Sequence, residues 1–369
     1  MKKTGLALIL ICLLTGLVFV PAVQASPGIT VTENRAEVDF PAGIMFSIAA
    51  GSSTDIIDIR LMYTVDRREH VRIVSEAFIY FSPSSSVEAE WFWDMRMTGG
   101  LPPGTGITYW WTVTDDSGET VETVPSRLVV EDERYAWQSI SEGMITLYWY
   151  DGSLSFAEEL MTATQSALTR LADNTGAELE SPVNLYIYDD ATALRGALIF
   201  AQDWTGGVAF SRYGVVAIGI GTSQSDLTWG KRVIAHELTH LVVHQVTFNP
   251  YGDTPTWLDE GLAMNAEGEP ATSFTNVFKE ALESGALISV RSLASPFSAY
   301  ASISYLAYAE SYELVTYLLE EYGRDKMLAL LETFARGSGY DEALLSVYGF
   351  DMDGLNTEWL ASLEAVTTT

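Results

Sequence analysis

The stretch from Lys231 to Ala263, KRVIAHELTHLVVHQVTFNPYGDTPTWLDEGLA, determines how the remaining sequence is interpreted. Its first half predicts a helix on which His236 and His240 are four residues apart, so both imidazoles project from one face about one turn apart. Two imidazoles in this arrangement can bind one metal ion. Glu237 lies beside them and is placed to take a proton from an attacking water rather than to bind the metal.

The helix that carries these side chains is predicted to be buried, because apolar residues occur on nearly all of its faces. Two histidines and a glutamate in such a helix lose hydration unless each group has a partner. A metal ion would provide that partner. The alternative is that the five-residue pattern HELTH arose by chance in a buried helix, and the second motif, WLDEGLA, argues against that alternative.

Glu260, inside the second motif, is predicted to be the third metal ligand. Asp253 or Thr254 can cap a helix that has Pro255 at its first position, where a missing N–H is tolerated. Glu260 then lies in the second turn, and Gly261 allows this helix to approach the first one closely. Three protein ligands leave a fourth position for water, which is the arrangement of a catalytic zinc site.

Two neighbouring residues compete with this assignment. Asp259 could replace Glu260, but on a helix it points about 100° away, which favours a capping or solvated role. His244 continues the four-residue spacing, but it lies roughly 12 Å along the helix axis from His236, too far to share one ion. We interpret His244 as a packed histidine or as one that supports a ligand.

The two motifs together resemble those of the gluzincin metallopeptidases, and most closely the peptidase MA-like group, over about Glu131 to Leu363. The resemblance implies Zn²⁺ held by His236, His240 and Glu260. It also implies Glu237 as the general base and a peptide or protein as the substrate.

Two further segments extend the resemblance. The stretch YAESYELVTYL resembles a helix that carries a tyrosine over the scissile carbonyl, which would make Tyr308 a donor to the oxyanion. Tyr305 and Tyr312 share its face and are the alternatives. Gly206–Phe210 resembles the edge strand that pairs with an extended peptide in this superfamily, and an ordinary glycine-rich hairpin is the alternative.

Two departures from the family limit what the resemblance implies. The Gly-x-Met-Glu-Asn motif, with which aminopeptidases of this group hold a free amino terminus, is absent from the sequence. This favours endopeptidase activity or another hydrolysis. Met264 stands where thermolysin-like enzymes have an aspartate that orients the first histidine, so a different side chain must orient His236.

The remaining sequence predicts two domains. Residues 26–132 alternate strand-like segments with turn clusters such as Gly51-Ser52-Ser53, which predicts an all-β sandwich of the immunoglobulin or fibronectin type. Residues 133–369 begin with strands and end in helices, which predicts an α+β catalytic domain, thermolysin-like by the resemblance. The predicted strands are Gly28–Val38, Ile56–Tyr63, Val71–Phe81, Val87–Met95, Ile107–Thr114, Glu119–Val130, Ile145–Tyr150, Val183–Tyr188, Gly206–Phe210 and Tyr213–Ile220. The predicted helices are Leu154–Leu171, a short one from about Ala191, Gly230–Val246, Pro255–Glu267, Thr272–Ser284, Tyr300–Tyr322, Arg324–Arg336 and Met352–Leu363.

The first 25 residues have the pattern of a secretory signal peptide: two lysines, an apolar run, and a small-residue cleavage site ending at Ala25. An uncleaved membrane anchor is the alternative. Cleavage would remove Cys12, the only cysteine, so the metal site must be built from histidine and carboxylate. We therefore expect a protein secreted or held at the cell surface, with no membrane span after cleavage.

The chain is strongly acidic, with 20 basic and 49 acidic residues and a net charge of −29. Such a surface repels nucleic acid and anionic membranes. Adaptation to high salt and loose binding of divalent cations are both compatible with the excess. The sequence thus predicts an exported zinc metallopeptidase. The alternative is an extracellular binding or adhesion protein with a catalytically silent metallopeptidase-like domain.

Overall fold

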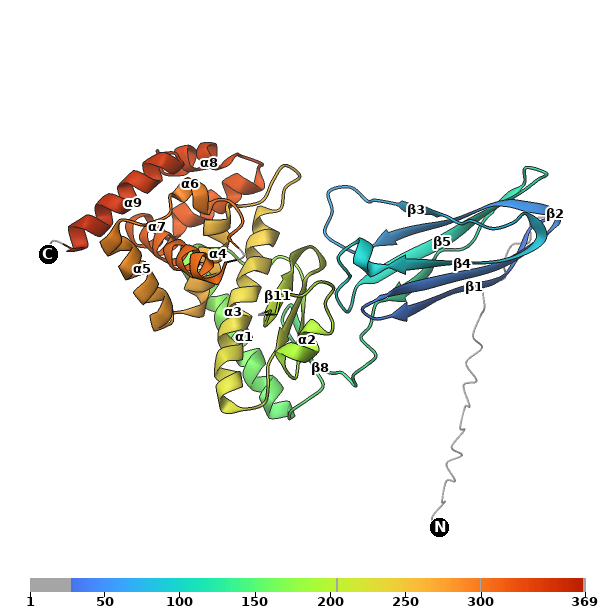
Figure 1. Ribbon diagram of the computed structural model, residues 1–369, viewed down its shortest axis with the longest axis horizontal. Helices are drawn as coiled ribbons and strands as arrows, with labels where there is room; N and C mark the ends of the chain where they lie inside the picture. The colour runs from blue at the N-terminus through green and yellow to red at the C-terminus, as the bar shows by residue number, and fades with distance from the viewer. Residues whose placement is uncertain (1–27, 204, 299, 368–369) are drawn as a thin grey trace, which may run out of the picture.

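The computed structural model describes residues 28–203, 205–298 and 300–367. The predicted signal peptide, residues 1–25, lies outside this range. A β-sandwich-like region at the N-terminal side is followed by a sheet and a group of helices, and the two regions lie end to end along the molecule (Figure 1). Within the described ranges, no helix combines the length and apolar character that crossing a membrane requires.

The β-sandwich-like region is built around one long strand, β2. Its first half pairs with β1 and β4, and its second half pairs with β3 and β5, in each case antiparallel. The strands β6 and β7 pair with β5. The bounds are β1 Thr30–Asp39, β2 Gly43–Val65, β3 Ser75–Phe78, β4 Ser84–Asp94, β5 Gly106–Asp115, β6 Thr120–Glu122 and β7 Ser126–Val129.

The two halves of β2 belong to different layers. The change of partners falls between Gly51 and Ile56, where the pairing with β4 shifts in register. Near the other end, the ring of Tyr63 in the second half lies 4.7 Å from that of Trp93, which pairs with Ile44 in the first half. The chain therefore doubles back within β2. The turn predicted at Gly51-Ser52-Ser53 lies at this reversal, but its residues continue the strand.

The second region contains a five-stranded sheet with the order β11-β12-β10-β9-β8. The three central strands are parallel, and the edge strands β8 and β11 are antiparallel to their neighbours. Alternate residues of β10 face opposite sides: Leu185 joins the core under α1 and α3, and Tyr186 joins an aromatic cluster on the other face. The bounds are β8 Gln138–Glu142, β9 Ile145–Trp149, β10 Val183–Tyr188, β11 Gly207–Phe210 and β12 Val215–Gly219.

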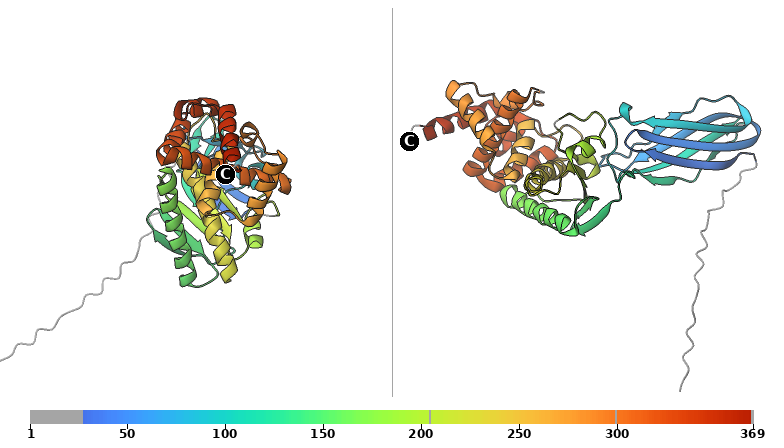
Figure 2. Two further views of the ribbon diagram at one scale, coloured as in Figure 1. Left: turned by 90° about the vertical axis from the view of Figure 1, so that its left-hand side faces the viewer. Right: turned by 60° about the horizontal axis from the view of Figure 1, so that its bottom comes forward.

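Nine α-helices occur among the described residues, and those after α3 form the end of the molecule away from the sandwich (Figure 2). The longest, α7, is interrupted at Gly323, whose φ of +77° lies in the left-handed region that favours glycine. This interruption agrees with the two helices predicted there. The bounds are α1 Leu154–Thr175, α2 Ala191–Arg195, α3 Gln224–Thr247, α4 Thr256–Glu267, α5 Thr272–Ser284, α6 Val290–Leu293, α7 Ala301–Ala335, α8 Tyr340–Val347 and α9 Met352–Thr367.

The helix α3, which carries the HELTH motif, begins six residues before the predicted start. Ser223 caps it, because its hydroxyl accepts a hydrogen bond from the backbone N–H of Asp226. The extension places Trp229 close to Gly206, and one turn later Val233 lies close to Gly207 of β11. The start of the helix thereby packs against the edge of the sheet that lies beside the HELTH side chains.

Contacts between the two regions involve several segments. The guanidinium of Arg68, in the loop after β2, donates a hydrogen bond of 2.9 Å to Oε2 of Glu180, between α1 and β10. The ring of His70 stacks on Phe248 at 4.2 Å, just beyond the end of α3. This stacking joins the loop between β2 and β3 to the second region.

Candidate metal centre

The HELTH motif occupies the middle of α3, where the helix is buried on several sides. Leu238, Leu241 and Val242 are each at most 1% exposed. His236 and His240 lie side by side on the remaining face, with ring centroids 4.8 Å apart. The four-residue spacing thus places both imidazoles together, as the sequence predicts.

Glu260 on α4 faces both imidazoles. Its Oε2 lies 3.4 Å from Nε2 of His236 and 3.5 Å from Nε2 of His240. The helix begins at Thr256, with Pro255 itself at the capping position and no side-chain cap. The prediction that Asp253 or Thr254 caps this helix was therefore wrong.

Gly261 allows a close helix approach, but to a different helix from the predicted one. A Cβ added there would lie 2.3 Å from the carbonyl oxygen of Ser311 on α7. The small residue thus brings α4 against α7 rather than against α3. This contact also brings α7 close to the cluster, which matters for Tyr308.

The donor set fits a zinc ion. The ligand atoms of His236, His240 and Glu260 all lie within 4.8 Å of one another. Oε2 of Glu260 is buried and has no hydrogen-bond partner among the described residues. Buried carboxylate oxygens are normally paired, so an unpaired one facing two imidazole nitrogens indicates a shared cation. Two nitrogens and one oxygen are the ligands of many catalytic zinc sites.

Each histidine also contacts a carboxylate through its other ring nitrogen. Nδ1 of His236 lies 2.8 Å from Oε1 of Glu267, and Nδ1 of His240 lies 2.9 Å from Oδ2 of Asp259. Such carboxylates orient a metal-binding imidazole and leave Nε2 free for the metal. The interpretation of Asp259 as a capping or solvated residue was wrong, because it binds His240.

Glu267 is the side chain that orients His236, a role that Met264 cannot fill. It lies seven residues after Glu260 on α4, which returns it to the same side of the helix. That seven-residue spacing is present in the sequence and could have identified Glu267. Arg232 on α3 holds Glu267 in turn, with its guanidinium 3.2 Å from Oε2 of the carboxylate.

These carboxylates also shift the pKa values of the two imidazoles. Burial lowers the pKa of both imidazoles, but the neighbouring carboxylates outweigh it and raise the pKa of His236 to about 10 and that of His240 to about 9. The carboxylates thus favour the protonated form of both imidazoles. Because a metal binds neutral imidazole, its binding must displace these protons. Burial also raises the pKa of the Glu237 carboxyl.

Glu237 lies against the edge strand. A Cβ added to Gly207 of β11 would come within 2.9 Å of Oε1 of Glu237. A larger residue at this position would displace the carboxylate, so the glycine keeps space for it. The glycine-rich segment 206–210 thus lies directly beside the predicted base.

Tyr308 is the tyrosine that contacts the cluster. Its hydroxyl donates a hydrogen bond of 3.3 Å to Oε1 of Glu260, and burial raises its pKa, so the hydroxyl keeps its proton. Tyr305 is 46% exposed and its ring packs 5.0 Å from that of Phe274. The structure therefore favours Tyr308 over Tyr305.

His244 lies outside the cluster. Its Nε2 is buried without a hydrogen-bond partner among the described residues, and its ring lies 5.4 Å from that of Phe248. Burial lowers its pKa, so it is neutral at pH 7. The structure places His244 as a packed histidine.

Several solved structures resemble the chain at low sequence identity. An M1 zinc metallopeptidase from Deinococcus radiodurans is 12% identical, with 91% of this chain and 94% of that chain covered and a TM-score of 0.37. Aminopeptidase A from Legionella pneumophila, in complex with aspartic acid, is 11% identical, with 90% and 50% covered and a TM-score of 0.38. OgpA from Akkermansia muciniphila is 9% identical, with 30% and 32% covered and a TM-score of 0.22. The chain thus spans half the length of the Legionella enzyme and about a third of OgpA.

No curated protein matches the chain. The family model of the Peptidase MA superfamily matches residues 162–365, from within α1 to within α9. Because this match covers more than half of the chain and includes both the HELTH and the WLDEGLA motifs, the protein belongs to the Peptidase MA superfamily.

Proposed function

We propose that the protein is an exported zinc metallopeptidase that hydrolyses peptide bonds. The observation that carries the proposal is the convergence of His236, His240 and Glu260 with Glu237 beside them. Membership of the Peptidase MA superfamily supports it. When bound, zinc would polarise the scissile carbonyl and lower the pKa of the attacking water.

The side chains of the site have complementary roles in this reaction. Glu237 accepts the proton of the attacking water and passes it to the leaving amine, and its raised pKa makes it a better proton acceptor. Tyr308 donates a hydrogen bond to the oxyanion that forms on the former carbonyl. Asp259 and Glu267 keep the two imidazoles in the orientation that binds metal.

The edge strand β11 offers a place for the substrate backbone. It pairs with β12 on one side, and no other strand of the described residues pairs with it. An extended peptide that adds to this edge would pass beside Glu237, because Gly207 lies against that carboxylate. The lack of the Gly-x-Met-Glu-Asn motif favours an endopeptidase over an aminopeptidase.

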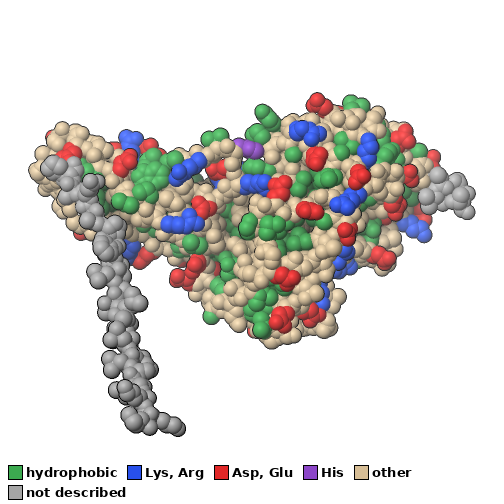
Figure 3. All heavy atoms as spheres, turned by 180° about the vertical axis from the view of Figure 1, so that it is seen from behind, with side chains coloured by type: hydrophobic (Ala, Val, Ile, Leu, Met, Phe, Trp, Pro, Cys, Tyr) green, Lys and Arg blue, Asp and Glu red, His purple; other side chains and the backbone are tan. Residues whose placement is uncertain are grey.

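Export and the types of the two domains are proposed from the sequence. Residues 1–25 support export, and the strand pattern supports an immunoglobulin- or fibronectin-like sandwich before a thermolysin-like catalytic domain. On the face seen in Figure 3, lysine and arginine side chains are scattered among acidic ones and form no continuous basic surface. This distribution favours a protein or peptide substrate over nucleic acid.

The test is the Glu237→Gln variant, which keeps the shape of the side chain but removes the base. We expect it to retain one equivalent of zinc and to lose about 10²–10⁴-fold in the rate of peptide cleavage. Metal analysis and digestion of a peptide library measure both quantities. Glu158→Gln, an exposed change on α1, is the matched control and should cleave like wild type.

Two results would contradict the proposal. Cleavage by Glu237→Gln at the wild-type rate would remove Glu237 from the mechanism. One equivalent of zinc in the wild type without cleavage of any peptide would favour the alternative, an extracellular binding protein with a silent metallopeptidase-like domain.

A further inference from the structure

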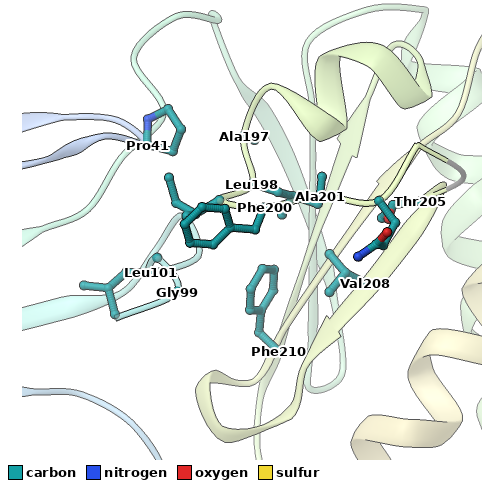
Figure 4. A pocket seen from close by; sticks show the side chains of 13 residues that line it. Pro41, Gly99, Leu101, Ala197, Leu198, Phe200, Ala201, Thr205, Val208 and Phe210 are labelled. Atoms are coloured by element: carbon teal, nitrogen blue, oxygen red, sulfur yellow. The ribbon is translucent and has the colours of Figure 1, made fainter. Parts of the chain in front are cut away.

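An apolar pocket lies where the sandwich meets the catalytic sheet (Figure 4). Its volume is about 220 Å³, and its walls come from three places. The sandwich contributes Pro41 and the segment 99–101, and the loop before β11 contributes residues 197–202 and 205. The strand β11 contributes Val208 and Phe210.

The pocket lies on the opposite side of β11 from the catalytic residues. Gly207 and Ala209 face α3, since Gly207 lies against Glu237 and Ala209 packs with the core under that helix. Val208 and Phe210 face the other way and join the aromatic cluster on the second face of the sheet. This alternation is the normal consequence of strand geometry.

A peptide paired with β11 would show the same alternation. Side chains of paired strands point to the same faces as their neighbours. A substrate residue whose side chain lies on the Glu237 side is therefore followed by one whose side chain lies on the Val208 side. That second side chain would enter the pocket.

The composition of the pocket restricts what it can bind. None of the thirteen described residues that line it is charged, although the chain carries 49 acidic and 20 basic residues. An ionised side chain that entered it would lose hydration without gaining a partner. Apolar side chains would gain from burial against Leu101, Leu198 and Val208.

Phe200 gives an independent reason to expect a ligand here. Its φ is +61°, a left-handed conformation that is uncommon and strained for a residue with a bulky side chain. Its side chain is nevertheless 73% exposed, and Figure 4 shows the ring between Pro41 and Phe210. Neither backbone preference nor burial explains this arrangement, whereas a ligand that covers the ring would.

We propose that this pocket binds one apolar side chain of the peptide substrate, on the residue next to the one that faces Glu237. The inference rests on the proposed peptidase function and adds its specificity. It also assigns the sandwich a role, because Pro41 and Leu101 form one wall of the pocket. The preference is for a large apolar side chain over an acidic one.

The test uses a set of extended peptides in which each position in turn carries leucine or aspartate. We expect one position at which leucine is preferred by about 10- to 200-fold in kcat/KM, as for other apolar pockets. Phe200→Asn removes the ring, and asparagine tolerates a positive φ. Val208→Thr is nearly isosteric and adds a hydroxyl to the wall.

Both variants should reduce the leucine preference at that position by about tenfold, because kcat/KM for the leucine peptide falls more than kcat/KM for the aspartate peptide. Tyr80→Asn, at an exposed aromatic residue of the sandwich outside the pocket, is the control and should keep the preference. An unchanged preference in both pocket variants would overturn the proposal, as would equal cleavage of the two peptides at every position.

A binding measurement separates this proposal from the proposed function. The same peptides are titrated into the zinc-loaded Glu237→Gln protein and into its double variant with Phe200→Asn. Tighter binding of the leucine peptide that is lost in the double variant supports the pocket, even if the wild type cleaves nothing. Equal binding of both peptides rejects the pocket, even if the wild type is an active peptidase.

Discussion

Histidines occur both in the middle of α3 and in its last turn. The two places differ in whether carboxylates of α4 lie close to the imidazoles. His236, His240 and His244 follow one another at the same spacing, yet only the first two face Glu260. Each of these two also has a carboxylate on its other ring nitrogen. His244 has Phe248 beside it instead.

The difference shows that spacing on one helix is insufficient to define a metal ligand. All three carboxylates come from the short helix α4: Asp259, Glu260 and Glu267. They reach the first two histidines because α4 packs against the middle of α3. The second helix therefore determines which imidazoles can bind a metal.

The largest expected effect comes from comparing the leucine variants of a candidate ligand, His240, and of the packed histidine, His244. His240→Leu removes a ligand and should abolish stoichiometric zinc binding and peptide cleavage. His244→Leu should retain both, and its melting temperature should be unchanged or higher, because a buried nitrogen without a partner is replaced by an apolar group. Metal analysis and thermal unfolding measure these outcomes. Loss of zinc in His244→Leu would refute the distinction between the two parts of α3.

The carboxylates behind the histidines should have an intermediate effect. Glu267→Gln and Asp259→Asn keep the side-chain shape and remove the negative charge that orients each imidazole. We expect each change to weaken zinc binding about 10- to 100-fold. Competition with a chelator of known affinity measures the change. If only one variant weakened binding, the two histidines would not be supported equivalently.

The clustering of the candidate metal ligands could be predicted from the sequence, whereas parts of their surroundings could not. The structure brings His236, His240 and Glu260 together. This could be predicted because the helix periodicity and the short connection between the two helices are both visible in the sequence. Glu267 was missed, although its seven-residue distance from Glu260 was available as a signal. Which helix packs against Gly261 could not be predicted from the sequence, since it depends on the position of α7.

Helices and strands were predicted correctly where the sequence shows a single clear hydrophobic pattern. They were missed where strand pairing determines the course of the chain. The strand Val183–Tyr188 and the helix Thr272–Ser284 coincide with β10 and α5. The doubling back of β2 was missed, since a glycine and serine cluster indicates a turn whether or not the strand continues through it. The short helices α6 and α8 were also missed, since four to eight residues hold too little periodicity.

The smallest expected effect concerns Arg232, which supports Glu267 but does not touch a histidine. Its contacts of 3.2 and 3.3 Å with Oε2 are long and partly exposed, so we expect a contribution of about 1 kcal/mol. Arg232→Met should therefore weaken zinc binding about fivefold. Lys231→Met, one residue earlier, removes the same charge from a residue paired with Glu159 on α1.

This pair of variants separates local orientation from the field of the whole protein. The chain is strongly acidic, with a net charge of −29, and loss of any cationic side chain makes it more attractive to a divalent cation. If only the net charge of the protein mattered, both variants would bind zinc slightly more tightly. Orientation of Glu267 predicts weaker binding in Arg232→Met alone. Tighter binding in Arg232→Met would show that Glu267 stays in place on His236 without the arginine.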